Sequence, residues 1–304
     1  MEKEIGLIGL GKMGKNIALN LLGNGYNVVV HNRSSAPMEE VAAKGAVKSS
    51  SIEDLVGKLK GRKVVWVMLP AGEVTNSTIE KLSGLLSKGD IIIDGSNSNF
   101  KNSVKLHEML KPKDILHLDA GCSGGPSGAL HGMCIMVGGD REAFDYTRGL
   151  LEKVSVPNGC LYTGEAGSGH FVKMVHNAIE YGMMQSIAEG MELISDKGPY
   201  KGLDINAICS LWNNGSVIRS YLVELAGRAI KNNDRKLSMI APYVEDTGEG
   251  RWAIQTAIDY SIPFTTITES LFERFRSRSG DHFSMRMLAA LRHEFGGHDI
   301  KKDG

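Results

Sequence analysis

Cysteine is scarce in this sequence, with four residues in 304. None of them forms a C-x-x-C pair, and their spacing is not that of a disulfide-dense scaffold. We therefore expect buried, reduced thiols, with two disulfides as the alternative. The four residues are Cys122, Cys134, Cys160 and Cys209.

An excess of charge of either sign is also missing, because 35 basic residues balance 35 acidic ones. This balance excludes general attraction to nucleic acid or to an anionic membrane, so an anionic small substrate would need a local basic site. No stretch of 18 uncharged apolar residues occurs, so no membrane span is expected. The N-terminus runs directly into an apolar strand and leaves no room for a signal peptide. We expect a cytoplasmic protein.

Short β-branched runs alternate with helical patterns as far as about Thr163. The predicted strands are residues 5–8, 28–31, 64–69, 91–94, 115–118 and 134–137. The predicted helices between them are residues 13–22, 37–44, 75–82 and 103–110. Nearly continuous apolar strands separated by helices are typical of a parallel sheet covered on both faces. We predict a Rossmann-type, doubly wound α/β domain.

The strand pattern disappears after Thr163, and long helical patterns follow. The first is predicted over residues 168–197, because Gly198 and Pro199 cannot continue a helix. We therefore predict two domains: a dinucleotide-binding domain over residues 1–163 and an all-helical substrate and oligomerisation domain over residues 164–304. The polar residues 301–304 are expected to fray.

A G-x-G-x-x-G turn, made by Gly9, Gly11 and Gly14, follows the first predicted strand and opens a helix. The first glycine permits the tight turn, the second lets a pyrophosphate approach the backbone, and the third permits close helix–strand packing. The helix N-terminus then offers unpaired N–H groups to the phosphates. Glycine turns between strands and helices are common, but the complete β–α–β setting favours a dinucleotide site here.

The second predicted strand ends in Asn32, Arg33 and Ser34, where an NAD enzyme usually carries an acidic residue for the ribose hydroxyls. Neither Asp nor Glu is present. Arg33 offers a guanidinium suited to a 2′-phosphate, with Ser34 as a further donor. An exposed loop arginine is the alternative, and we predict NADP in preference to NAD.

Four polar residues of different chemistry lie in the predicted helix over residues 168–197: Lys173, His176, Asn177 and Glu180. At 100° per residue they share about one third of the helix circumference. A solvent-exposed stripe is the simpler interpretation. However, the surrounding residues are so apolar that we expect the helix to be largely buried, and a buried Lys or Glu is suited to general acid–base chemistry.

Residues 167–182, Gly-Ser-Gly-His-Phe-Val-Lys-Met-Val-His-Asn-Ala-Ile-Glu-Tyr-Gly, resemble the signature of the 6-phosphogluconate dehydrogenase family. The resemblance covers almost the whole chain, and its length is similar to the short branch without the duplicated helical half. It continues at Ile-Ile-Asp-Gly-Ser-Asn-Ser (92–98), Gly-Cys-Ser-Gly-Gly (121–125), Trp-Asn-Asn-Gly (212–215), Gly-Glu-Gly-Arg-Trp (248–252), Leu-Phe-Glu-Arg (271–274) and Arg-His-Glu-Phe-Gly-Gly-His (292–298).

The resemblance implies oxidative decarboxylation of 6-phosphogluconate to ribulose 5-phosphate and CO2. Lys173 would take the C3 hydroxyl proton as hydride leaves C3 for the nicotinamide, and its ammonium would then polarise the 3-carbonyl. Glu180 would protonate C1 of the enediol. No metal is implied, since the ammonium replaces a Lewis acid.

The resemblance also implies the binding residues. The substrate carboxylate and hydroxyls would be held by Asn97, Ser123, Gly124, Gly125, His176 and Asn177. The phosphate would be bound by Tyr181 and Arg274, together with Arg292 and His298 from the tail of a neighbouring subunit in a homodimer or tetramer. The cofactor would be bound by Gly9, Gly11, Met13, Gly14, Asn32, Arg33, Ser34, Leu69, Pro70, Ala71 and Asn97.

Two positions depart from the long family members: Thr247 replaces a phosphate-binding Lys, and the loop over residues 67–72 is one residue shorter and lacks its Lys. Taken singly, Ser123 to Gly125 could be a simple turn, Arg274 a surface charge, and Arg292 and His298 part of a solvated tail. The alternatives for the whole chain are a 3-hydroxyisobutyrate-type β-hydroxyacid dehydrogenase and a non-catalytic nucleotide-sensing protein.

Overall fold

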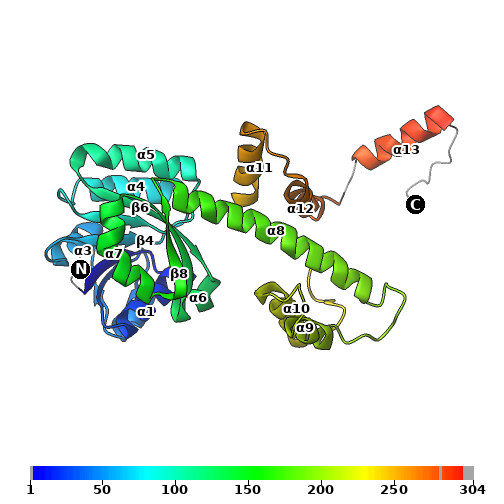
Figure 1. The fold of residues 1–304 in the computed structure, drawn as a ribbon, viewed down its shortest axis with the longest axis horizontal. Helices are drawn as coiled ribbons and strands as arrows, with labels where there is room; N and C mark the ends of the chain where they lie inside the picture. The colour runs from blue at the N-terminus through cyan, green and yellow to red at the C-terminus, as the bar shows by residue number, and fades with distance from the viewer. Residues whose placement is uncertain (1–2, 281–282, 297–304) are drawn as a thin grey trace. The chain divides into compact units, whose positions relative to one another are not determined.

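The computed structural model describes residues 3–280 and 283–296. The chain forms two compact units, Met1–Asn177 and Ala178–Gly304, and the division falls inside the long helix α8 (Ser168–Ile194). The first unit contains an eight-stranded sheet with its helices, and the second is helical (Figure 1). The predicted α/β fold followed by an all-helical region is confirmed.

The sheet has the strand order β3-β2-β1-β4-β5-β6-β7-β8. Its strands are β1 (Glu4–Ile8), β2 (Asn27–His31), β3 (Val47–Lys48), β4 (Val64–Val67), β5 (Ile91–Asp94), β6 (Leu116–Ser123), β7 (Met133–Gly139) and β8 (Ser155–Gly164). The order reverses beside β1, which pairs in parallel with both β2 and β4. In such sheets a ligand binds beyond the carboxyl ends of the strands at this reversal, where the glycine turn lies.

Helices cover both faces of the sheet (Figure 1). They are α1 (Lys12–Gly23), α2 (Ser35–Ala42), α3 (Ile52–Lys58), α4 (Glu73–Ser83), α5 (Phe100–Leu110), α6 (Gly125–His131) and α7 (Arg141–Lys153), and η1 (Lys111–Lys113) is a short 3-10 turn. Strand alternation divides the core: Ile91 and Ile93 pack towards α1, α6 and α7, whereas Ile92 packs towards α3, α4 and α5. Each such fully buried side chain contributes roughly 1.5–3 kcal/mol to stability.

One strand pair, β6 with β7, is antiparallel, which the sequence pattern did not indicate. Ser123 pairs with Cys134, so the chain returns from the end at which β6 finished. The connection holds only residues 124–132, and a parallel return needs a longer crossover. The sequence also did not predict β8, because an edge strand needs no continuous apolar run and this one exposes Val156 and Leu161.

The second unit is built from helices. Beyond α8 they are α9 (Ile205–Asn213), α10 (Tyr221–Asn232), α11 (Glu249–Asp259), α12 (Thr265–Arg276) and α13 (Phe283–Gly296). Helix α8 ends at Ile194, shortly before the Gly198–Pro199 stop that the sequence predicted. A small core of Ile205, Cys209 and Val223 joins α9 and α10.

Arg292, which the sequence analysis assigned to a tail, lies in the helix α13. The sequence from Met285 to Leu291 is rich in Met, Leu and Ala, which are strong helix formers. The side chain of Arg292 and the whole of His298 lie outside the described residues.

All four cysteines are free, and two of them, Cys122 and Cys209, are buried as expected. The expectation of burial is wrong for Cys134, which is exposed. Alternation along β7 is the reason, because Met133 and Ile135 on either side turn to the core. None of the helices in residues 3–280 and 283–296 is long and apolar enough to cross a membrane.

Candidate active site

The glycine turn after β1 has the geometry of a dinucleotide site. Gly9 has a φ of +96°, and a Cβ there would lie 2.4 Å from the Met68 carbonyl oxygen. A Cβ on Gly14 would lie 2.0 Å from the Gly9 carbonyl oxygen, so the helix packs closely on the turn. Gly11 faces open space, and no side chain caps the N-terminus of α1. The unpaired N–H groups of this first turn therefore fit a pyrophosphate.

The end of β2 presents Arg33 beside this turn. Asn32 accepts a hydrogen bond from the Leu10 N–H at 2.9 Å and donates to the Ser34 carbonyl and hydroxyl oxygens. Asn32 thus ties the end of β2 to the glycine turn. Arg33 is exposed and makes no hydrogen bond or ion pair with the residues that the structure describes.

The remaining predicted cofactor residues lie at the same edge of the sheet. Leu69, Pro70 and Ala71 follow β4, and the Leu69 side chain lies 2.9 Å from the position that a Cβ on Gly9 would take. Pro70 accepts a hydrogen bond from the hydroxyl of Thr75 at 2.8 Å, which fixes the loop to α4. Met13 packs partly buried against the core.

A cluster of polar side chains, here called the lysine cluster, gathers in the first unit. Lys173 is 6% exposed, and its Nζ donates to Asn177 Oδ1 at 2.6 Å. His176 Nδ1 lies 3.0 Å from the same oxygen, and His176 Nε2 lies 3.2 Å from Ser123 Oγ. The helical spacing that predicted this stripe is confirmed for these three α8 residues, and the sheet adds Ser123 from β6.

Asn97 ties the chain that follows β5 to Cys122 of β6, the residue before Ser123. It has a φ of +55°, donates to the Cys122 carbonyl oxygen at 3.2 Å and accepts from the Cys122 N–H at 2.9 Å. Gly124 and Gly125 directly follow Ser123 in the chain. Both have positive φ, and α6 begins at them. The structure therefore brings Asn97, Ser123 and the start of α6 together at the ends of β5 and β6.

Burial perturbs several groups around this cluster. It raises the pKa of the Cys122 thiol to about 12, although the nearby Lys173 charge lowers it in part. It also raises the pKa of Asp119 and lowers that of His117 to about 4. The sequence analysis missed Asp119, and the available signal was an acidic residue inside the apolar strand Leu116–Ser123.

The prediction that α8 is largely buried is wrong for several of its apolar residues. Phe171, Val172, Ile179, Met183 and Met184 are all more than a third exposed. Helical spacing fixes which residues share a face, but only the packed chain decides which face is covered. Glu180 lies on α8 seven residues after Lys173 and is half-buried.

Tyr181 and Arg274, predicted to bind phosphate, lie against each other in the second unit. The Arg274 guanidinium carbon is 3.4 Å from the centre of the Tyr181 ring, and Arg274 Nη1 donates to the Glu245 carbonyl oxygen at 3.1 Å. The Tyr181 hydroxyl accepts from the Thr247 N–H at 3.4 Å. Thr247 therefore contributes its backbone at the place where long family members were expected to supply a Lys.

A group of ion pairs that the sequence analysis did not single out holds the loop that carries Thr247. Asp246 binds Arg251 at 2.7 Å and also Arg278 at 2.5 Å, and its own side chain is only 4% exposed. Hydrogen bonding from Arg251, helped by Arg278, lowers the pKa of Asp246 to about 2. The pair of arginines thereby fixes the loop that carries Thr247.

Two known families match successive parts of the chain. Residues 4–164 match the family described as the NAD binding domain of 6-phosphogluconate dehydrogenase. Residues 169–301 match the 6-phosphogluconate dehydrogenase C-terminal domain. The chain belongs to the 6-phosphogluconate dehydrogenase family.

The members of this dehydrogenase family that resemble the chain differ in length. The Bacillus subtilis protein YqeC is 43% identical over 98% of this chain and 99% of its own. A Haloferax volcanii protein named NAD(+)-dependent, decarboxylating 6-phosphogluconate dehydrogenase is 39% identical over 98% and 99% of the two chains. The Plasmodium falciparum 6-phosphogluconate dehydrogenase structure has a TM-score of 0.82 at 31% identity and covers 99% of this chain but 66% of its own. This dehydrogenase family therefore includes members of the present short length.

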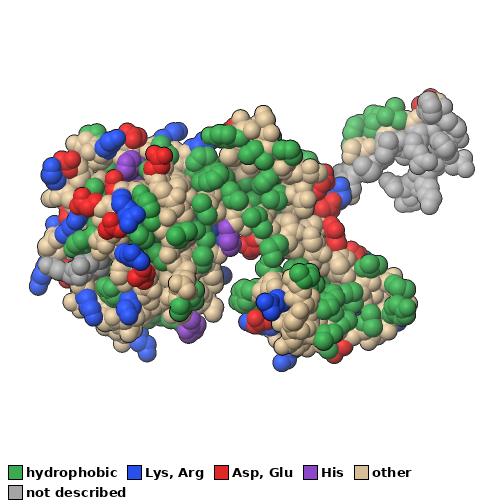
Figure 2. All heavy atoms as spheres, in the orientation of Figure 1, with side chains coloured by type: hydrophobic (Ala, Val, Ile, Leu, Met, Phe, Trp, Pro, Cys, Tyr) green, Lys and Arg blue, Asp and Glu red, His purple; other side chains and the backbone are tan. Residues whose placement is uncertain are grey.

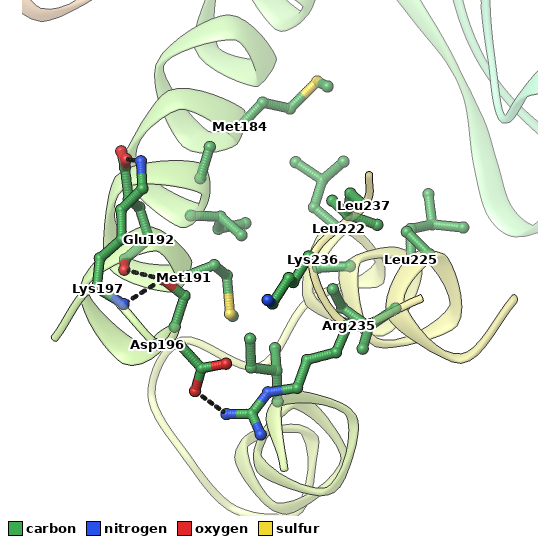
Figure 3. A pocket seen from close by; sticks show the side chains of 17 residues that line it. Met184, Met191, Glu192, Asp196, Lys197, Leu222, Leu225, Arg235, Lys236 and Leu237 are labelled. Carbon is green, nitrogen blue, oxygen red and sulfur yellow. Dashed lines mark hydrogen bonds and ion pairs between the residues drawn. The ribbon is translucent and has the colours of Figure 1, made fainter. Parts of the chain in front are cut away.

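A pocket of about 890 Å³ lies in the second unit (Figure 3). Its wall is mainly apolar, with Met184, Met191 and Leu222 among the lining residues. At its rim Arg235 pairs with Asp196 at 3.0 Å. In residues 3–280 and 283–296, no group of three or more His, Cys, Asp or Glu side chains is placed to hold a metal ion.

Proposed function

We propose that the protein catalyses the oxidative decarboxylation of 6-phosphogluconate to ribulose 5-phosphate and CO2. The observation that carries the proposal is the buried Lys173, whose Nζ is held at 2.6 Å by Asn177 beside His176 and Ser123. Family membership supports this substrate, and the Plasmodium falciparum relative was solved in complex with 6-phosphogluconate. Similarity to two solved 3-hydroxyisobutyrate dehydrogenases, at 22% and 17% identity, extends to the fold alone and does not favour that alternative.

Lys173 acts first as a general base. Its amine takes the proton of the C3 hydroxyl while the C3 hydrogen leaves as hydride. The nicotinamide nucleotide, when bound, supplies the acceptor for that hydride. The ammonium thus formed on Lys173 polarises the 3-carbonyl, so that the bond to the carboxylate breaks and CO2 leaves. Electrons from that bond form the carbon–carbon double bond of the enediol, and Lys173 returns its proton to the former 3-carbonyl oxygen.

Glu180 acts after decarboxylation as the general acid. It lies two helical turns beyond Lys173 on α8, on the same side of the helix by the 3.6-residue repeat. It gives a proton to C1 of the enediol while Lys173 takes the proton of the C2 hydroxyl, which completes ribulose 5-phosphate. Asn97, Ser123, Gly124, Gly125, His176 and Asn177 bind the carboxylate and hydroxyls.

The substrate phosphate is assigned to Tyr181 and Arg274. Tyr181 accepts from the Thr247 N–H, so its own hydroxyl hydrogen can be donated to a phosphate oxygen. The Arg274 guanidinium lies over the ring and presents several further donors. Arg292 and His298 from a neighbouring subunit complete this proposed phosphate site.

We assign NADP as the preferred nucleotide. Arg33 supports this, since it is exposed beside the glycine turn and neither Asp nor Glu stands at the end of β2. NAD is the alternative, which the names of the Haloferax volcanii relative and of a Bacillus subtilis relative support. The glycine turn, with Asn32, Ser34, Leu69, Pro70 and Ala71, would bind either nucleotide.

The proposed enzyme is a homo-oligomer. Figure 2 shows hydrophobic side chains gathered over the part of the chain that holds α9 and α10, where Leu211, Val217 and Tyr221 are exposed. Exposed apolar patches of this kind are typical of surfaces that contact another chain. Sedimentation of dilute protein will show association, and deletion of residues 291–304 should weaken it and raise the KM for 6-phosphogluconate.

One assay tests the proposed reaction. Purified protein is mixed with 6-phosphogluconate and either NADP or NAD, and reduced nucleotide, CO2 and ribulose 5-phosphate are measured together. Equal amounts of the three products are expected. Lys173→Met should lower kcat by at least about 10²-fold, the lower end for a general base, while nucleotide binding remains. Absence of all three products with the wild-type protein would refute the proposed function.

A further inference from the structure

The first turns of α8 lie close against the sheet at three glycines. A Cβ on Gly121 of β6 would lie 2.4 Å from the Lys173 Cβ. A Cβ on Gly169 would lie 2.2 Å from the Asp119 carbonyl oxygen, and one on Gly138 of β7 would lie 2.6 Å from the Gly169 nitrogen. Glycine at these three positions therefore permits a close approach of helix and sheet that a Cβ at any of them would prevent.

Asp119 of β6 forms the polar part of this contact. Its Oδ1 accepts from the Gly167 N–H and its Oδ2 from the His170 N–H, each at 2.7 Å. The side chain is fully buried. The first N–H groups of a helix have no partner within the helix, so a carboxylate at this place satisfies two of them and interacts favourably with the helix dipole.

We propose that Asp119 is a positioning residue for Lys173. It lies on a strand, and it binds two amides in the first turn of the helix that carries the lysine. Two hydrogen bonds from one fixed carboxylate determine both the axial position and the rotation of that turn, which a single hydroxyl cap cannot do. Lys173 lies three residues beyond His170, so a displaced first turn moves the lysine with it.

A second side-chain contact also holds the first turn of α8 in place. Ser103 Oγ on α5 lies 2.7 Å from His170 Nδ1, and both side chains are buried. His170 is therefore tied to Asp119 through its backbone and to Ser103 through its ring. The first turn of α8 is thus attached to β6 and to α5 immediately before the lysine cluster begins.

This inference rests on the proposed function, and its test is the variant Asp119→Asn. The amide places an NH2 group against one of the two backbone N–H groups and so breaks that hydrogen bond. We expect kcat per nucleotide-binding molecule to fall by about 10–10²-fold, as for a misplaced catalytic group, while the KM for nucleotide stays unchanged. Hydrogen exchange should increase in peptides that contain Gly167 and His170.

Asp90→Asn is the matched control. Asp90 is also buried and also accepts two backbone N–H bonds, from Lys63 at 2.8 Å and Ser87 at 2.9 Å, but it lies before β5 and does not contact α8. We expect it to keep the parental kcat and the parental exchange around Gly167. Comparison of the two variants distinguishes the general effect of neutralising a buried carboxylate from the specific effect of neutralising the carboxylate that binds α8.

The outcomes are distinct. Parental kcat in Asp119→Asn, or a rate that falls only in proportion to nucleotide-binding protein, overturns the positioning role. If this variant does not fold, residue-resolved exchange of the wild-type protein decides: slow exchange at the Gly167 and His170 amides supports the role, and fast exchange at both overturns it. A wild-type protein without turnover refutes the proposed function instead. In that case the exchange rates of the Gly167 and His170 amides still test whether Asp119 binds the first turn of α8.

Discussion

The side-chain oxygen of Asn177 lies 2.6 Å from the Nζ of Lys173, one helical turn away, and 3.0 Å from His176 Nδ1. Lys173 Nζ also lies 3.5 Å from His176 Nδ1, and His176 Nε2 lies 3.2 Å from Ser123 Oγ. The Asn177 oxygen accepts from the lysine and lies within hydrogen-bond distance of the histidine. One amide oxygen therefore contacts both side chains of the lysine cluster that precede it on α8.

Asn177→Leu should lower kcat by about 10-fold or more, because Lys173 loses the acceptor that holds its amine in place. The KM for nucleotide should not change. Steady-state kinetics with 6-phosphogluconate measure both, and Gln185→Leu on the same helix is the control. An unaltered kcat would show that Asn177 does not position the lysine.

Glu180→Gln should slow protonation of the enediol without preventing hydride transfer. We expect kcat to fall by about 10²-fold or more, whereas reduced nucleotide still forms in the first turnover. Stopped-flow absorbance separates the two steps. Glu189→Gln, on an exposed part of α8, should behave as wild type. A parental steady-state rate in Glu180→Gln would assign Glu180 a structural role.

Arg33→Asp should shift preference from NADP to NAD. The new carboxylate would repel a 2′-phosphate and accept hydrogen bonds from the ribose hydroxyls. The ratio of kcat/KM for the two nucleotides measures the change directly. An unchanged ratio would mean that Arg33 does not contact the nucleotide.

Arg274→Ala should raise the KM for 6-phosphogluconate by about 10–10²-fold, as expected for a charged hydrogen bond worth about 1.5–3 kcal/mol. Nucleotide affinity should stay the same. Arg276→Ala, an exposed arginine on the same helix that pairs with Glu273, provides the control. A wild-type KM in Arg274→Ala would remove this residue from the phosphate site.

His117 should make stability depend on pH. Burial lowers its pKa to about 4, so the folded state binds the proton less well than the unfolded chain, whose His pKa is 6.5. This stability is fully present above about pH 6.5 and is lost as pH falls towards 4. Between pH 7.5 and 5 the free energy of unfolding should fall by about 2 kcal/mol from this residue. Urea unfolding of wild type and His117→Gln at both pH values measures the difference, and equal pH dependence in the two proteins would contradict the assignment.

Several features could be predicted because they depend on neighbours in the chain. The strand-turn-helix around Gly9 is local, and so are the six predicted strands with their continuous apolar residues. The 3.6-residue repeat placed Lys173, His176 and Asn177 on one side of a helix before its surroundings were known. By contrast, the short edge strand β3 and the exposed strand β8 carry no such pattern.

The α/β fold, the glycine turn and the order of polar groups along α8 could all be predicted, because each depends on residue types at short, regular spacing. The packed chain alone shows that β7 runs antiparallel to β6, that Ser123 of β6 contacts His176 of α8, and that Asp119 binds the first turn of α8. Asp119 and Gly167 are 48 residues apart in the chain. A hydrogen bond of that range depends on strand order and on three glycines that let helix and sheet touch, and no local pattern encodes it.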